Sequence, residues 1–366
     1  MNPPPVPRIR IVLAQQNAGW VIGKMGQRLC EQLLAMGCAA DLAADPDPGA
    51  DLNHWMSFAF APGCPQTLNS MFITHADDPY KVALIKRLLG GPIQMGLCMS
   101  PHAADELAGL GVERQRLWHV LPALDAPVAP RRIRVGITTR VYDDGRKRES
   151  LLVRLADEMP LDAFSFRIFG SGWEAVVPLL ERAGAEVMYD PGCSDWLGDY
   201  ERIRRAIPDF DYYLYLGMDE GSLGTLDALS AGVRTIVTAQ GFHLSLPGGI
   251  DHPFTDYAQV HEVFAGLAAS HRERAARLTG WTWEAYAREH LAIWKLMLAH
   301  QPGAVPLEAL AALPTRDTGA HRALPVAGRI ARRDLQFRLR MLSPTRIRGA
   351  IARLPLLQPL RRFLGH

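Results

Sequence analysis

Acidic and small residues gather between positions 219 and 232, where the chain reads DEGSLGTLDALSAG. Asp219 and Asp227 are eight positions apart, and Glu220 lies beside the first of them. The residues that follow these two adjacent acids are Gly221, Ser222, Leu223 and Gly224. Glycines let a backbone approach a ligand closely, and a helix N-terminus attracts phosphate and sugar oxygens. The pattern therefore predicts a wall for a polar ligand, although acids that only cap a helix would give the same pattern.

Basic residues form a second candidate group, in the stretch GITTRVYDDGRKR at positions 136–148. Arg140 and Lys147 follow a predicted strand, and Arg146 competes with Lys147 for the same role. Arginine and lysine placed after a strand can neutralise a diphosphate, and the arginine fork can bind it through two hydrogen bonds. The alternative is a solvated basic loop that pairs with the two aspartates before Gly145.

Two features of the first third of the chain also have chemical potential. His75 closes a predicted strand and can hydrogen-bond a ligand, although a lone histidine there is usually structural. His54, one strand earlier, is expected to be either structural or acceptor-facing. Gly19 and Gly23 belong to a glycine-rich loop with the spacing G-x3-G-x2-G. That spacing differs from the dinucleotide pattern G-x-G-x-x-G, which disfavours NAD binding and leaves either a ligand loop or an ordinary strand-to-helix turn.

The elements that position these residues alternate along the chain. Short apolar runs predict strands, and stretches of helical periodicity between them predict helices. The predicted strands are 9–14, 51–60, 70–75, 117–121, 133–138, 165–169, 186–189, 212–216 and 234–238. The predicted helices are 25–36, 105–110, 149–158, 174–183, 200–206 and 225–231, the last with Ser222 or Thr225 as its cap. This alternation predicts parallel sheets covered by helices, with ligands bound beyond the carboxyl ends of the strands.

Length and composition limit the class of protein. The chain has 366 residues, 48% of them hydrophobic, which suggests two domains and argues against disorder. A Pro-rich stretch at 125–132 predicts the linker between them. Five cysteines, an odd number without any C-x-x-C spacing, argue against a disulfide framework and a zinc site, and indicate a reducing cytoplasm. From these residues we expect neither a secretory leader nor a membrane-spanning stretch.

The stretch 219–232 resembles the E-x7-E region of the retaining, group 1 (family 4) glycosyltransferases of the GT-B fold. Residues 226–232, LDALSAG, match the helical part of that motif. Residues 98–125 resemble the end of the family's first domain, and 279–294 resemble its closing Trp-containing helix. The resemblance covers about residues 8–300. Both motif glutamates are replaced by aspartate, and the turn after Pro122 lacks the usual Asn-Gly.

The resemblance implies an α/β GT-B fold, with two Rossmann-like doubly wound domains facing a cleft and a basic helical C-terminal extension. Its domains would be 1–128 on the acceptor side, 129–300 for the nucleotide-sugar, and a Pro/Ala-rich connector with a basic tail at 301–366. It implies a hexosyltransferase-type enzyme that retains anomeric configuration and needs neither metal nor cofactor besides the nucleotide-sugar donor substrate. A sugar-nucleotide epimerase and a non-catalytic scaffold of glycan assembly stay as alternatives.

The resemblance also assigns roles to individual residues. Asp219 or Glu220 would orient the donor sugar, and His75 would hydrogen-bond it. Asp227 would bind the ribose, and Arg140 with Lys147 would hold the diphosphate. The remaining residues expected to approach the donor are Gly19, Gly23, Gly221, Ser222, Leu223 and Gly224.

The C-terminal segment differs from the rest of the chain in charge. Residues 321–366 contain eleven arginines and one aspartate, whereas the other 320 residues carry more acids than bases. Arginines beside apolar residues at helical spacing suit an anionic membrane surface, and packing on the acidic body of the same chain is the alternative. Nucleic acid is disfavoured, because only two aromatic residues, Phe337 and Phe363, lie among the eleven arginines. We therefore expect a cytoplasmic protein attached to the inner membrane face, acting on a lipid-linked or bacterial cell-envelope glycan.

Overall fold

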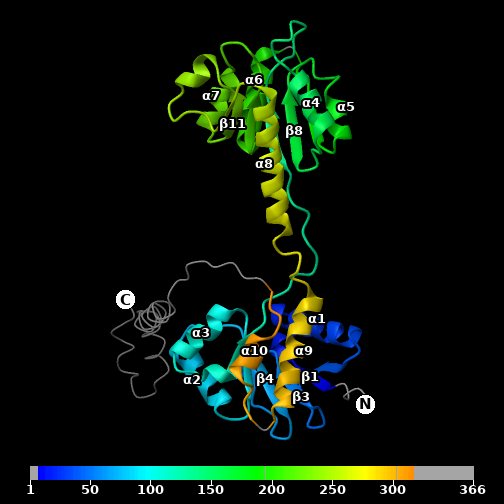
Figure 1. The fold of residues 1–366 in the computed structure, drawn as a ribbon, viewed down its shortest axis with the longest axis vertical. Helices are drawn as coiled ribbons and strands as arrows, with labels where there is room; N and C mark the ends of the chain where they lie inside the picture. The colour runs from blue at the N-terminus through cyan, green and yellow to red at the C-terminus, as the bar shows by residue number, and fades with distance from the viewer. Residues whose placement is uncertain (1–6, 194, 302, 317–366) are drawn as a thin grey trace, which may run out of the picture. The chain divides into compact units, whose positions relative to one another are not determined.

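The computed structural model describes residues 7–193, 195–301 and 303–316. These residues form two compact units (Figure 1): the first comprises the described residues up to 127 and from 279 to 316, and the second comprises those from 128 to 278. The basic segment 321–366, for which we expect amphipathic helices, lies outside the described residues. Each unit contains one sheet of six strands, all of whose neighbouring strands pair in parallel.

The sheet of the first unit has the strand order β2-β1-β3-β4-β5-β6. Its strands are β1 Arg8–Val12, β2 Ala39–Ala43, β3 Leu52–Trp55, β4 Leu68–Ile73, β5 Met95–Cys98 and β6 Leu117–His119. Its helices are α1 Val21–Ala35, α2 Pro79–Leu89, α3 Pro101–Gly109, α9 Trp283–Ala299 and α10 Leu307–Ala311. The order reverses between β1 and β3, so the loop that follows β1 lies at a topological switch point.

The sheet of the second unit has the order β12-β11-β10-β7-β8-β9. Its strands are β7 Ile133–Ile137, β8 Phe164–Phe169, β9 Glu186–Asp190, β10 Tyr212–Tyr215, β11 Arg234–Thr238 and β12 His252–Phe254. Its helices are α4 Ser150–Glu158, α5 Val177–Arg182, α6 Trp196–Ala206, α7 Leu223–Ser230 and α8 Tyr257–Ala276. This is the doubly wound Rossmann order, and its switch point lies between β7 and β10.

Helix α9 returns to the first unit after the second has been completed. Its buried face includes Trp283, Tyr286, Ile293 and Trp294, which join the core formed by α1 and one face of the first sheet. The Trp294 indole N–H donates to the Ser70 hydroxyl of β4 at 3.0 Å. The expected second domain, which ran to residue 300, therefore differs from the unit that the structure shows, because the apolar face of α9 finds its partner in the first sheet.

The expected α/β class and the two doubly wound domains are confirmed by these sheets. The expected strand at 51–60 is shorter and ends at Trp55, where the chain turns into a 3-10 helix at Phe58–Phe60. Helix α1 begins four residues earlier than expected, directly after Trp20. Six helices and strands had no expected counterpart: β2, α2, β5, β12, α8 and α10.

Candidate functional site

The loops after β7 and β10 meet at the switch point of the second unit. The Lys147 ammonium contacts a carboxylate oxygen of Asp219 at 2.6 Å and donates to the Tyr215 hydroxyl at 2.9 Å. Tyr215 in turn donates to the other carboxylate oxygen of Asp219. The Lys147 side chain is only 12% exposed, against 31% for that of Asp219. Two residues separated by 72 positions in the chain thus form a partly buried ion pair, as the parallel topology requires of loops after neighbouring strands.

The charges in this contact are arranged to keep Asp219 ionised. Partial burial opposes ionisation, but the hydrogen bonds from Lys147 and Tyr215 outweigh it and hold the pKa of the Asp219 carboxyl below its ordinary value. Burial, and then the hydrogen bond to Asp219, raises the pKa of Tyr215, which stays a hydroxyl donor. The cluster therefore offers one cation, one carboxylate and one neutral hydroxyl.

Arg146 and Glu220, the alternatives to Lys147 and Asp219 in the sequence analysis, lie outside this contact. Arg146 is exposed, contacts Asp144 at 3.4 Å and stacks over the Tyr142 ring at 4.3 Å. The Glu220 side chain is exposed, and its backbone carbonyl accepts from the Phe242 amide at 3.0 Å. In this structure Lys147 and Asp219, rather than these neighbours, form the central contact.

A strained residue braces the loop after β7. Arg148 has a φ of 50°, in the left-handed region that is costly for a residue with a side chain. Its guanidinium donates to the Leu216 carbonyl at 2.6 Å and to the Thr238 hydroxyl at 2.9 Å. It thereby ties the loop after β7 to the ends of β10 and β11. The sequence shows no signal for this brace, because a third basic residue in GRKR looks like part of a solvated run.

Helix α7 begins immediately after the acidic loop. Ser222 occupies the N-cap position, but its side chain does not make the expected cap and instead bonds the Tyr213 hydroxyl at 2.8 Å. Gly221 has a φ of 122°. A Cβ at Gly224 would collide with the hydroxyls of Tyr213 and Thr138. The small residues of this loop are thus required by close packing around the helix N-terminus.

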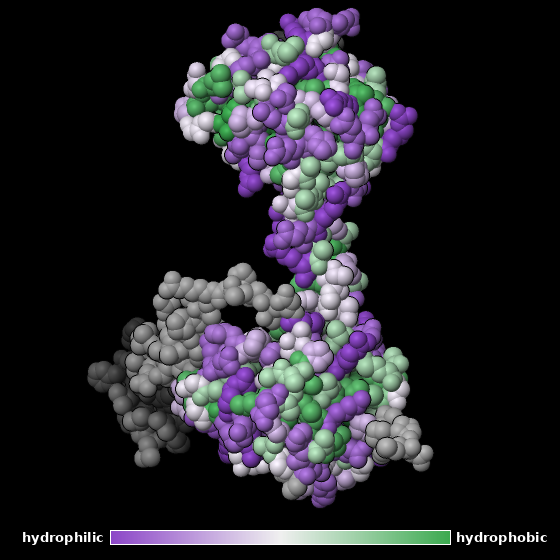
Figure 2. Space-filling model, viewed as in Figure 1, coloured by the Kyte–Doolittle hydropathy of each residue, from purple (hydrophilic) through white to green (hydrophobic). Residues whose placement is uncertain are grey.

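Asp227 lies on α7, one turn inside the helix. The Tyr200 hydroxyl of α6 donates to its carboxylate at 3.3 Å. Leu223 and Leu226, also on α7, are 74% and 43% exposed. Figure 2 shows apolar residues, coloured green, gathered over this part of the second unit. The helix acid is therefore accessible beside an apolar rim.

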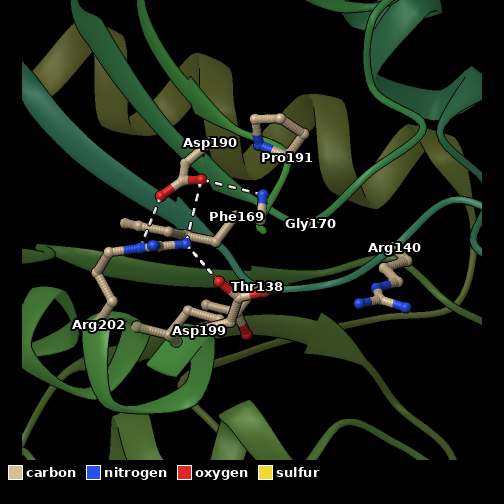
Figure 3. Close-up of a pocket in the computed structure, with 10 residues that line it drawn as sticks. Thr138, Arg140, Phe169, Gly170, Asp190, Pro191, Asp199 and Arg202 are labelled. Carbon is tan, nitrogen blue, oxygen red and sulfur yellow. Dashed lines mark hydrogen bonds and ion pairs between the residues drawn. The ribbon is translucent and has the colours of Figure 1, made fainter. Parts of the chain in front are cut away.

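Arg140 lines a pocket of about 90 Å³ at the carboxyl ends of β7, β8 and β9 (Figure 3). Across that pocket Arg202 of α6 contacts Asp190 at 3.0 Å and Asp199 at 2.6 Å. Figure 3 shows Arg140 projecting on the other side from this group, with Thr138 between them. Arg140 is accordingly not part of the Lys147–Asp219 contact.

The other predicted residues belong to the first unit. His75 follows β4, and its Nδ1 lies 2.6 Å from the Thr74 hydroxyl. Gly19 is exposed with open space around it, whereas a Cβ on Gly23 would collide with the backbone that precedes α1. Gly23 therefore has a packing reason to be glycine. His54 is fully buried, in agreement with a structural role.

Several residues of the site were not expected from the sequence. Tyr213 and Tyr215 alternate along β10 and so project from the same face of the sheet. The recurrence of tyrosine at this spacing just before an acidic loop is the signal that could have found them.

No helix in the described part of the chain is long and apolar enough to cross a membrane. Among the same residues, no group of three or more His, Cys, Asp or Glu side chains could hold a metal ion.

Comparisons with known proteins add likenesses of fold only. No protein-family model and no curated protein matches the chain. A glycosyltransferase from Rickettsia africae is 9% identical, with 81% of this chain and 99% of that one covered at a TM-score of 0.34. HepE of Anabaena, solved with UDP and glucose, is 9% identical, with 79% of this chain and 99% of that one covered at a TM-score of 0.31. The lipopolysaccharide outer core galactosyltransferase WaaB is 10% identical, with 79% of this chain and 100% of that one covered at a TM-score of 0.30.

Proposed function

We propose that the chain is a glycosyltransferase that moves a sugar from a nucleotide diphosphate donor to a glycan acceptor. The observation that supports this proposal is the contact between Lys147 and Asp219 at the switch point of the second sheet, directly before the N-terminus of α7. At this edge a cation and a helix N-terminus suit the diphosphate of such a donor, and a carboxylate suits its sugar hydroxyls.

The diphosphate is the leaving group, and its developing charge must be stabilised. Lys147 supplies a positive charge in a partly buried position, where electrostatic interactions are stronger than in water. The amides of Leu223 and Gly224, at the first helical positions of α7, have no carbonyl one turn earlier in the helix to bond. They are suited to the phosphate oxygens, and Arg140 approaches the same donor from the pocket beside β8 and β9.

The two acids then act on different hydroxyls. Asp219, held ionised by Lys147 and Tyr215, orients the donor sugar by accepting hydrogen bonds from it. Asp227, about one turn inside α7, binds the ribose. Because Lys147 already contacts Asp219, an incoming diphosphate either shares the ammonium with Asp219 or displaces it. His75 of the first unit would hydrogen-bond the transferring sugar, as the family resemblance suggests.

The finer features of the reaction are part of the same proposal. We infer retention of anomeric configuration by front-face attack of the acceptor hydroxyl, without a metal and without a cofactor. The acceptor is a lipid-linked or cell-envelope glycan, and the basic segment 321–366 brings the enzyme to the inner membrane face. Sedimentation of the full chain and of a chain ending at residue 320 with anionic vesicles tests that attachment, and equal pelleting of both contradicts it.

Calorimetric binding of the full chain to a panel of nucleoside diphosphates tests the function. We expect one base to be preferred, and Lys147→Ala to weaken that binding about tenfold or more through the lost charge-assisted bond. Arg182→Ala, an exposed arginine at the end of α5, is the matched control and should bind as the wild type. A wild-type chain that binds no nucleoside diphosphate would favour the scaffold alternative, which the aspartates in both motif positions keep open.

Wild-type turnover with a screened donor separates transfer from the epimerase alternative. A transferase consumes the donor only when an acceptor hydroxyl or water takes the sugar, and releases the nucleoside diphosphate. An epimerase converts the sugar configuration without that release.

A further inference from the structure

His243 lies under the N-terminus of α7, although it belongs to the loop after the next strand, β11. It is 1% exposed and occupies the 3-10 helix Gly241–Ser245. Its Nδ1 lies 2.9 Å from the Thr238 carbonyl, which can only accept. Its Nε2 lies 3.1 Å from the Ser222 amide, which can only donate. Both contacts require the same tautomer, with the proton on Nδ1 and an accepting lone pair on Nε2.

The same Nε2 also meets the hydroxyl of Thr225 at 3.0 Å. Ser222 is the N-cap of α7, and Thr225 is the third residue inside it. In a capping box, a glutamate or glutamine at that third position reaches back to accept from the N-cap amide. Threonine is too short for this, and the Ser222 hydroxyl is engaged by Tyr213. His243 therefore accepts the hydrogen bond from the Ser222 amide, although it belongs to a different loop. In a capping box the third residue of the helix would accept that bond.

The contact also fixes the acidic loop that leads into the helix. The Phe242 amide donates to the Glu220 carbonyl at 3.0 Å. A Cβ on Gly221 would collide with the rings of Phe242 and His243, so the two loops touch without space between them. The loop after β11 thus packs directly against the Gly221–Gly224 turn and fixes its position.

We propose that His243 is a positioning residue of the candidate donor site, which fixes the first turn of α7 so that the amides of Leu223 and Gly224 can bind the donor diphosphate. The inference rests on the proposed function and adds a residue that the family motif does not include. It predicts that loss of the Nε2 acceptor weakens recognition of the diphosphate more than recognition of the nucleoside.

The test compares the full-length wild type with His243→Ala and His243→Gln, because the glutamine carbonyl can replace Nε2 as an acceptor. His261→Gln, on helix α8, is the matched control for the same chemical change. Amide hydrogen exchange over residues 221–226 reports the cap. Calorimetry with the preferred nucleoside diphosphate and with its free nucleoside reports the site.

We expect His243→Ala to lose protection of residues 221–226 and to bind the diphosphate about tenfold more weakly, with nucleoside affinity unchanged. His243→Gln should restore most of both losses, and His261→Gln should behave as the wild type. Equal binding of the diphosphate by His243→Ala and the wild type overturns the inference, as does an equal loss for diphosphate and nucleoside. A wild type that binds no nucleoside diphosphate instead rejects the proposed function, and this inference with it.

Discussion

The buried histidines of the first unit predict that its stability falls on mild acidification. His54 of β3 and His290 of α9 are both fully buried, with their ring centroids 5.3 Å apart. Burial lowers the pKa of His290 to about 4 and that of His54 well below its ordinary value. The neighbouring Arg316 guanidinium adds to this for His290, whereas the hydrogen bond to the Tyr286 carbonyl opposes it. Protonation of either ring is therefore energetically unfavourable while the core is intact.

The size of the effect follows from proton linkage. In the unfolded chain a histidine titrates near pH 6.5, so the unfolded state binds more protons than the folded state below that pH. Stability contributed by neutral His290 is therefore complete above about pH 6.5 and is lost as the pH falls toward 4. The loss from this residue alone is about 2 kcal/mol at pH 5 and approaches about 3 kcal/mol below pH 4.

Urea unfolding followed by tryptophan fluorescence between pH 7.5 and 5 measures this loss. This range lies above the ordinary carboxylate titrations, so histidines dominate the slope. His290→Leu removes the titrating ring and should flatten the pH dependence of the unfolding free energy. His300→Leu is the control, because His300 makes the same bond to a carbonyl four residues earlier in α9 but is only half-buried. An unchanged slope in His290→Leu would refute the reasoning.

Three further predictions concern packing and buried polar groups. Gly224→Ala should shift the start of α7 and weaken nucleoside diphosphate binding about tenfold in calorimetry, whereas Gly266→Ala, in open space on α8, should bind normally and melt slightly higher. Arg316→Ala leaves the largely buried Glu289 carboxylate without its two-bond partner and should cost about 3 kcal/mol in chemical denaturation; no change would show the pair to be dispensable. Asn69→Ala removes four side-chain hydrogen bonds around the start of β4 and should lower the free energy of unfolding by about 2–3 kcal/mol, measured in the same way.

The parts of the fold that the sequence predicts are those set by local patterns. Strands β7, β8, β10 and β11 are short apolar runs between glycines, prolines and charges, and each lies within one or two residues of its expected range. Strand β2 lacks such a pattern, because AADLA contains no apolar alternation and no residue of it is buried. The topological rule for parallel sheets then suffices to bring the loops after β7 and β10 together.

The parts that the sequence does not predict depend on contacts distant in the chain. Nothing in Trp283–Ala299 says which of two sheets its apolar face will cover. His243 becomes part of the candidate site only through two hydrogen bonds to a helix that precedes it by twenty residues. The Ser222 side chain does not form the expected helix cap. It bonds the Tyr213 hydroxyl of β10 instead, a contact that the local sequence does not predict.

The return of α9 has a consequence for the order in which the chain can fold during synthesis. Residues 1–127 leave the ribosome first, yet one face of their sheet receives its cover only when residues 283–299 emerge, after the whole of the second unit. The second unit is continuous and can complete itself in the meantime. We therefore expect the nascent first unit to expose apolar surface during this interval, and to aggregate when the chain is truncated before residue 279.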